Sequence, residues 1–165
     1  MLKIFGAAAV FLPCFITGLV KSYRLKKRCD SLASLKLSAE RIGAEISFTK
    51  KRLERIFSEI SRDFNLPVFY DTAMSVQSMG LKSAWTASIT KYSDSMALTE
   101  QDIKALETLG ELGSYTGDEQ QRCIRTAAKL LELSHTEALD VYSRTGKLCR
   151  SSGTLFGILA VILLI

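Results

Sequence analysis

The feature that most constrains this chain is the position of its uncharged runs. Ile4–Val20 is a run of seventeen residues without a charge, and a basic cluster follows it at once. As an α-helix this run would rise about 26 Å, close to the ~30 Å thickness of a bilayer's hydrocarbon core. The other end is also apolar, over Thr154–Ile165. The pattern predicts a membrane helix over residues 1–20, a body over 21–150 and a short membrane helix over 151–165.

The two predicted membrane helices carry small residues at helical spacing. Gly6 and Ala9 lie in the first helix, and Gly153 and Gly157 form a G-x-x-x-G step in the second. Small residues at this spacing let two helix backbones approach closely, which would suit a hairpin of the two ends. Because G-x-x-x-G arises often by chance, a plain apolar anchor without specific pairing is an equal alternative.

The net charge of +5 suggests a nucleic-acid partner until the charges are located. Eight of the 22 basic residues lie in or beside the apolar ends, which leaves 14 basic against all 17 acidic residues for positions 29–146. A body with this balance repels phosphate, so we expect no nucleic-acid partner. Basic residues that flank a membrane helix indicate the cytoplasmic side and attract anionic lipid. The body is therefore predicted to be cytoplasmic.

Apolar residues recur through the body at spacings of three and four. Helices are expected over residues 32–46, 53–64, 68–79, 83–96, 99–110 and 118–142, the first of them continuous with the N-terminal membrane helix. Thr49 is expected to cap the second of these helices, and Thr99 with Asp102 resembles a capping box. The predicted fold class is all-α, an antiparallel bundle of about six helices with membrane helices at both ends.

No constellation of catalytic residues is recognisable. Gly146-Lys147 lacks both the earlier glycine and the following hydroxyl of a phosphate-binding loop. The single histidine, His135, has no nucleophile or metal-ligand partner at a suitable spacing. The four cysteines, at positions 14, 29, 123 and 149, show no C-x-x-C and are expected to be reduced and buried. We therefore predict a protein that is not an enzyme and that has no catalytic residues, cofactor or metal.

Several features taken in order resemble a known family. The N-terminal apolar span is followed by a run of basic residues, and a tryptophan lies near the middle of the chain. A pair of glycines then precedes a segment with acidic and amide side chains. Basic residues come just before the apolar C-terminal tail. The residues that carry the pattern are Trp85, Gly110, Gly113, Asp118, Glu119, Gln121, Lys147, Arg150 and Gly153. The whole chain resembles the stage III sporulation protein AB family of spore-forming bacteria.

The resemblance implies a non-enzymatic platform subunit of the channel between mother cell and forespore, required for spore formation. It places the chain in the mother-cell membrane that faces the forespore, with its central domain in the cytoplasm. Its cytoplasmic domain would be similar to those of type II secretion and type IV pilus platform proteins. These dock a secretion-type ATPase, here stage III sporulation protein AA. Other channel subunits and a second copy of the chain are further candidate partners.

The contact surface for the ATPase is not specified by the resemblance. Helix faces that contain Arg52, Arg55, Arg122 and Arg125 are candidates, although the same arginines also suit a solvated face. An alternative function is a membrane-anchored regulatory or assembly factor that has no ATPase partner.

Overall fold

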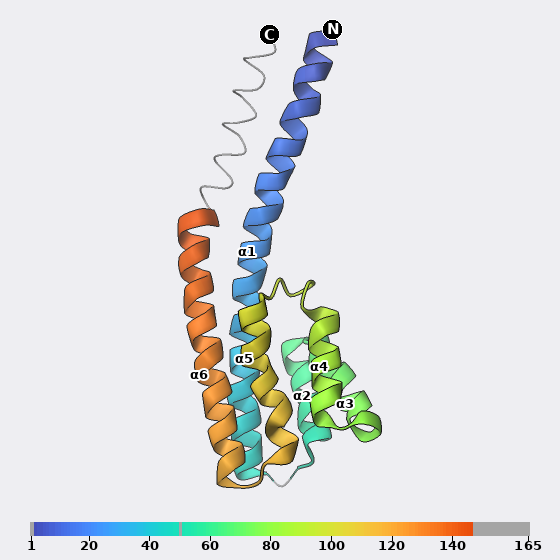
Figure 1. Cartoon of the computed structure of the whole chain (residues 1–165), viewed down its shortest axis with the longest axis vertical. Coiled ribbons are helices and arrows are strands. Elements are labelled where there is room, and N and C mark those ends of the chain that lie inside the picture. Colours follow the sequence, from blue (N-terminus) through green and yellow to red (C-terminus); the bar gives the residue numbers. More distant parts are fainter. Residues whose placement is uncertain (1, 50, 147–165) are drawn as a thin grey trace. The chain divides into compact units, whose positions relative to one another are not determined.

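The computed structural model describes residues 2–49 and 51–146, and the regular secondary structure of this part of the chain is all helical (Figure 1). It contains α1 (Leu2–Phe48), α2 (Leu53–Phe64), α3 (Pro67–Met79), α4 (Leu81–Tyr92), α5 (Glu100–Gly110) and α6 (Asp118–Val141). A 3₁₀ turn, η1 (Glu111–Ser114), follows α5, and a π-helical turn, η2 (Tyr142–Gly146), follows α6. The all-α class and the helical bundle are confirmed, and the expected continuity of the first body helix with the N-terminal segment is seen in α1.

The chain divides into two compact units. Asp30–Thr136 forms one, and Met1–Cys29 together with Glu137–Ile165 forms the other. The first contains α2 to α5 and most of α6, and it holds the fold's core. In the described part of the chain, no helix has the combination of length and hydropathy that identifies a membrane span. The two membrane helices therefore stay predictions, and residues 151–165 lie outside the described part.

The short helices α2 and α3 end where the local sequence prevents continuation. Asn65 follows α2 in the left-handed region, with φ of 52°, and its backbone N–H donates to the Ser61 carbonyl. Pro67 then occupies the first turn of α3, where its missing N–H costs nothing. Gly80 separates α3 from α4 with φ of 78° and ψ of 161°, a backbone conformation that residues other than glycine rarely adopt.

Two helix boundaries differ from expectation. The cap of α2 is Arg52, without a side-chain hydrogen bond, whereas the Thr49 hydroxyl donates to the Glu45 carbonyl at 2.6 Å and closes the last turn of α1. A threonine hydroxyl can accept a hydrogen bond at the start of a following helix or donate one to a carbonyl of the preceding helix, and here it donates to a carbonyl at the end of α1. The fourth helix ends at Tyr92 instead of Met96. The capping box is confirmed, because Thr99 and Asp102 exchange backbone-to-side-chain hydrogen bonds of 2.8 and 3.4 Å.

An aromatic cluster joins α2, α3 and α4. The ring centroid of Trp85 lies 5.1 Å from that of Phe69 and 5.9 Å from that of Phe57, and the two phenylalanine rings are 5.5 Å apart. All three side chains are at most 1% exposed. The Trp85 indole N–H donates to the Leu106 carbonyl of α5 at 2.7 Å, so one side chain links four helices.

A second contact between α4 and the end of α5 depends on small residues. A Cβ atom at Gly110 would lie 3.0 Å from Cδ1 of Trp85, and one at Gly113 would lie 3.2 Å from Cβ of Leu81. Both distances are shorter than ordinary van der Waals contact. The two glycines therefore allow α5 and η1 to lie directly against α4.

Helix α6 packs on α1 and α5 within the same unit. Its buried stripe is Cys123, Ile124, Ala127 and Leu131. The Gln121 amide donates to the Gly43 carbonyl at 3.1 Å and to the Ser47 hydroxyl at 2.7 Å, both on α1. The Cys123 thiol is 3.0 Å from the Thr108 carbonyl of α5. These polar contacts on both flanks of the stripe orient α6, so its opposite face is directed to solvent.

We expect Gly110→Ala to destabilise the chain by about 1–2 kcal/mol. The added methyl gains helix propensity of up to about 1 kcal/mol, but it would lie 3.0 Å from the fully buried Trp85 indole, and such overpacking typically costs about 1–3 kcal/mol. Denaturant unfolding of the purified chain in mild detergent measures the change. Glu107→Ala, at an exposed site on the same helix, should stay within about 0.5 kcal/mol. An unchanged midpoint for Gly110→Ala would contradict the close packing of these helices.

The turn between α4 and α5 yields a stabilising prediction. Ala97 has φ of 56° and lies in a turn closed by the Leu98 N–H to the Ser93 carbonyl at 2.9 Å. Glycine adopts this backbone without the steric cost that Cβ imposes, so Ala97→Gly should raise the free energy of unfolding by about 0.5–1 kcal/mol. Ala44→Gly, on the exposed side of α1, should lower it by about 1 kcal/mol. Thermal unfolding followed by circular dichroism distinguishes the two signs.

Candidate functional site

The exposed face of α6 carries a row of cations. Arg122, Arg125 and Lys129 are spaced by three and four residues, so they share one face of the helix, and all three are exposed. This face lies opposite the buried stripe, because the contacts of Gln121 and Cys123 hold the helix in that rotation. We call these three residues the α6 ridge.

The three cations of the α6 ridge have no ion-pair partner within the described ranges, a property that they share with exposed cations such as Arg52, Arg62 and Lys104. What sets the ridge apart from those three is that its cations lie together on one face of a single helix. Seven other cations are paired with carboxylates at 2.6–3.6 Å; these are Lys36, Arg41, Lys51, Arg55, Lys82, Lys91 and Arg144. Paired surface charges are largely neutralised locally, whereas unpaired ones keep their field for an incoming partner. The ridge is therefore a candidate site for an acidic partner.

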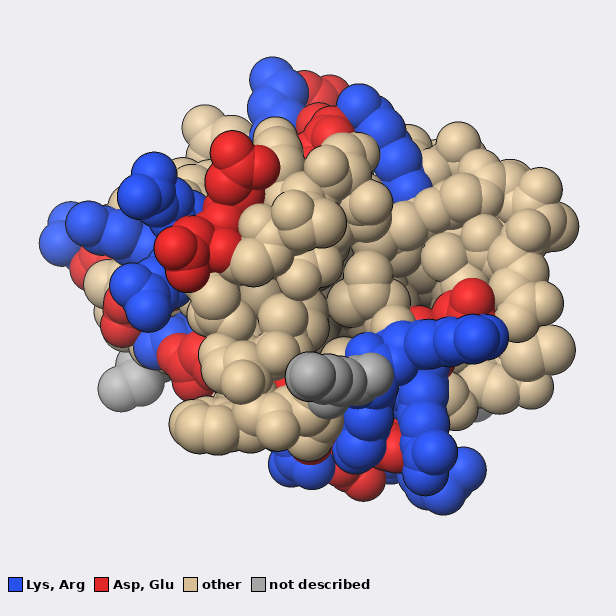
Figure 2. All heavy atoms as spheres, turned by 90° about the horizontal axis from the view of Figure 1, so that it is seen from below, with Lys and Arg blue, Asp and Glu red and all other residues tan. Residues whose placement is uncertain are grey.

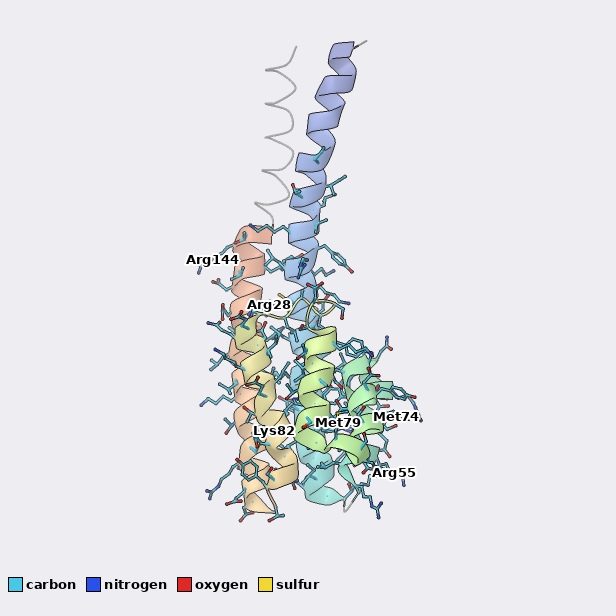
Figure 3. The ribbon with its side chains drawn as sticks, turned by 45° about the vertical axis from the view of Figure 1, so that its right-hand side comes forward. Arg28, Arg55, Met74, Met79, Lys82 and Arg144 are labelled. Atoms are coloured by element: carbon cyan, nitrogen blue, oxygen red, sulfur yellow. The ribbon has the colours of Figure 1, made fainter. Side chains whose placement is uncertain are left out.

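The four arginines selected from the sequence do not behave alike. Arg122 and Arg125 lie together on the α6 ridge, but Arg52 and Arg55 lie at the start of α2. Arg55, which is labelled in Figure 3, is paired with Glu59 at 3.1 Å, whereas Arg52 has no ion pair among the described residues. On the face shown in Figure 2, Lys and Arg side chains form several separate groups with acidic and uncharged residues between them. The structure thus favours the α6 pair.

An exposed leucine extends the α6 ridge. Leu133 is 60% exposed and lies four residues beyond Lys129, one turn further along the same face. An apolar side chain beside unpaired cations is typical of protein contact sites, where the apolar group is buried and the charges guide association. Sequence reasoning missed Lys129 and Leu133, although their spacing from Arg122 and Arg125 would have identified them.

A second surface lies between α3 and α4, and it was not predicted. It is an open groove of about 430 Å³, lined by Tyr70, Asp71, Met74, Ser75, Met79, Ala84, Ala87, Ser88 and Lys91. Tyr70, Met74 and Met79 are 52%, 69% and 52% exposed, which is unusual for such large side chains. Met74 and Met79 are labelled on this helix pair in Figure 3. The signal in the sequence is that Lys82 is the only charged residue between positions 72 and 90.

A small polar network forms part of the groove lining. The Asp71 carboxylate accepts hydrogen bonds from the Lys91 ammonium at 2.6 Å and the Tyr92 hydroxyl at 2.9 Å. The bond to Lys91 holds the pKa of Asp71 below its ordinary value and raises that of Lys91. At neutral pH the Asp71 carboxylate and the Lys91 ammonium therefore neutralise each other, and the groove lining has no unpaired charge.

The residues selected from the family pattern have structural roles where they are described. Trp85, Gly110, Gly113 and Gln121 make the helix contacts described above, whereas Asp118 and Glu119 begin α6. Lys147, Arg150, Gly153 and Gly157 lie outside the described residues. Gly6 and Ala9 fall in α1, in a stretch whose side chains the structure does not describe.

The remaining reactive side chains are dispersed. Cys29 and Cys123 are buried, as expected, and burial raises the pKa of Cys123. His135 is half-buried on α6. Within residues 2–49 and 51–146 no group of three metal-binding side chains comes together.

Comparison with known proteins agrees with this architecture. The family model for stage III sporulation protein AB matches residues 3–165. Stage III sporulation protein AB of Bacillus subtilis (strain 168) is 26% identical over 170 residues, and the alignment covers 99% of each chain. A solved structure of stage III sporulation protein AB shares the fold with a TM-score of 0.65 and 23% identity, over 71% of this chain and 97% of that one. Because the family model spans nearly its whole length, this chain belongs to the stage III sporulation protein AB family.

Proposed function

We propose that this protein is a non-enzymatic platform subunit of the sporulation channel, with a helical body that docks a secretion-type ATPase such as stage III sporulation protein AA. Membership of the family supports a role in spore formation. The observation that carries the docking proposal is the α6 ridge, three exposed cations without partners among the described residues.

The membrane attachment in this proposal rests on the sequence. The uncharged runs at both ends and the basic residues beside them favour the mother-cell membrane that faces the forespore, with the body in the cytoplasm. Attachment at the ends would leave the Asp30–Thr136 unit free to meet a cytoplasmic ATPase and other channel subunits.

The chemistry of the α6 ridge specifies what the ATPase would present. The partner surface would carry carboxylates spaced to match Arg122, Arg125 and Lys129 along one face of a helix. Beside them it would carry an apolar group to contact Leu133. Rigid helical packing behind the ridge would transmit a displacement of α6 to α1, because Gln121 and the Lys36–Glu132 ion pair of 3.0 Å join the two helices. A platform that passes ATPase motion to a membrane helix needs such a connection.

Charge reversal on the ridge tests the docking face. We expect Arg122→Glu with Arg125→Glu to raise the Kd for the purified ATPase at least tenfold, about 1.4 kcal/mol, since like charges would then face each other. The assay is surface-immobilised binding of the detergent-solubilised full chain. Added salt should weaken the unsubstituted complex much more than the variant complex.

The matched control is Arg52→Glu with Arg55→Glu, the same charge change on α2, which should alter the Kd less than threefold. If the control pair weakens binding and the α6 pair does not, the docking face lies on α2. If the unsubstituted chain does not bind the ATPase, the alternative of a regulatory or assembly factor without an ATPase partner replaces the platform.

A further inference from the structure

We propose that the α3–α4 surface is the contact between two copies of this chain, in a dimer with two-fold symmetry. The proposal concerns a different surface from the α6 ridge and does not depend on ATPase docking. It rests on the shape and charge of the groove.

The groove and the side chains that could fill it lie on the same face. Tyr70, Met74 and Met79 are large and exposed on α3, while the α4 wall is built from the small residues Ala84, Ala87 and Ser88. In a two-fold symmetric contact the same surface of each copy must supply both the inserted side chains and the groove that accepts them. Methionine suits the inserted role because its flexible side chain adapts to a shallow groove.

Charge identifies a second copy as the occupant. A surface with a free charge repels its own copy across a two-fold axis, unless an opposite charge lies beside it. Here the charges are already paired internally, Asp71 with Lys91 at 2.6 Å and Lys82 with Glu111 at 2.6 Å. The exposed residues Gln77 and Ser78, which directly precede Met79, carry uncharged side chains. The α6 ridge has the opposite property, because three unpaired cations cannot face their own copy.

The size of the surface limits the affinity. Helices of 13 and 12 residues are about 20 Å long, so the paired face offers roughly 400 Å² per copy. The total of about 800 Å² lies below the roughly 1,200–2,000 Å² of stable interfaces, and so the dimer should be weak in solution and should form at about 10–100 μM. Copies held in one membrane would meet at a higher effective concentration.

The first measurement is the mass of the detergent-solubilised full chain by sedimentation equilibrium, over protein concentrations from about 1 to 200 μM. We expect a reversible change from monomer to dimer within this range. A chain that stays monomeric at 200 μM overturns the proposal, and so does a mass beyond that of a dimer.

Two substitutions on neighbouring residues of α4 locate the contact. Ala87→Glu places a charge in the groove and should weaken the dimer at least tenfold. Thr86→Glu places the same charge on the same helix outside the groove lining and should change the dimer Kd less than threefold. Far-UV circular dichroism and thermal unfolding should be alike for both variants, because both positions are exposed. Equal effects of the two variants on dimerisation overturn the assignment.

A mixing experiment tests the two-fold geometry directly. Met74→Lys should also weaken self-association, but an equimolar mixture of Met74→Lys and Ala87→Glu chains should form mixed dimers, since one of the two contacts becomes an ion pair and the other is unchanged. Differently tagged chains make the mixed dimer measurable by co-purification. Failure of the mixture to associate better than either variant alone contradicts this packing. Loss of ATPase binding by Ala87→Glu without any change in mass would assign the groove to the ATPase instead.

Discussion

The burial of Trp85 is the interaction on which the rest of the body depends. Its ring contacts Phe57 and Phe69, and its N–H satisfies a carbonyl of α5, so α2 to α5 meet at one side chain. An indole in this position buries more apolar area than any alternative and still has a partner for its polar atom. Gly110 is then required beside it, because any side chain would occupy the volume of the ring. The tryptophan and the glycines of the family pattern are parts of one packing arrangement.

This core also determines what is left for the surface. The inner sides of α3 and α4 are buried through Phe69, Trp85 and Leu81, so the outer sides present large α3 side chains beside small α4 residues. Gln121 and Cys123 fix the rotation of α6, so its cations Arg122, Arg125 and Lys129 are exposed, and they form no ion pair among the described residues. The α3–α4 surface and the α6 ridge differ in charge, and therefore we expect them to bind different partners.

Much of the fold could be predicted from periodicity, since apolar stripes at three- and four-residue spacing are nearly independent of tertiary context. The helix ends near residues 64 and 79 and the capping box at Thr99 could be predicted for the same reason, because each depends on residues only a few positions apart. Thr49 was assigned to the wrong helix because its hydroxyl can serve α1 or α2, and only the position of the Glu45 carbonyl decides. The end of α4 was placed too late because Met96 is buried from a turn and not from a helix.

The sequence by itself determined the all-helical class, the family and the separation of a charged body from two apolar ends, since composition, local spacing and residue order carry these. The membrane role of those ends is a prediction from the sequence alone. Only the tertiary structure decided which charges are paired, because Lys91 forms an ion pair with Asp71, and Lys82 with Glu111, between different helical segments. It likewise decided that Arg122 and Arg125 share a ridge with Lys129, and that exposed methionines border a groove of small residues. Both depend on how each helix is rotated against its neighbours, which the burial of Trp85 and the contacts of Gln121 set.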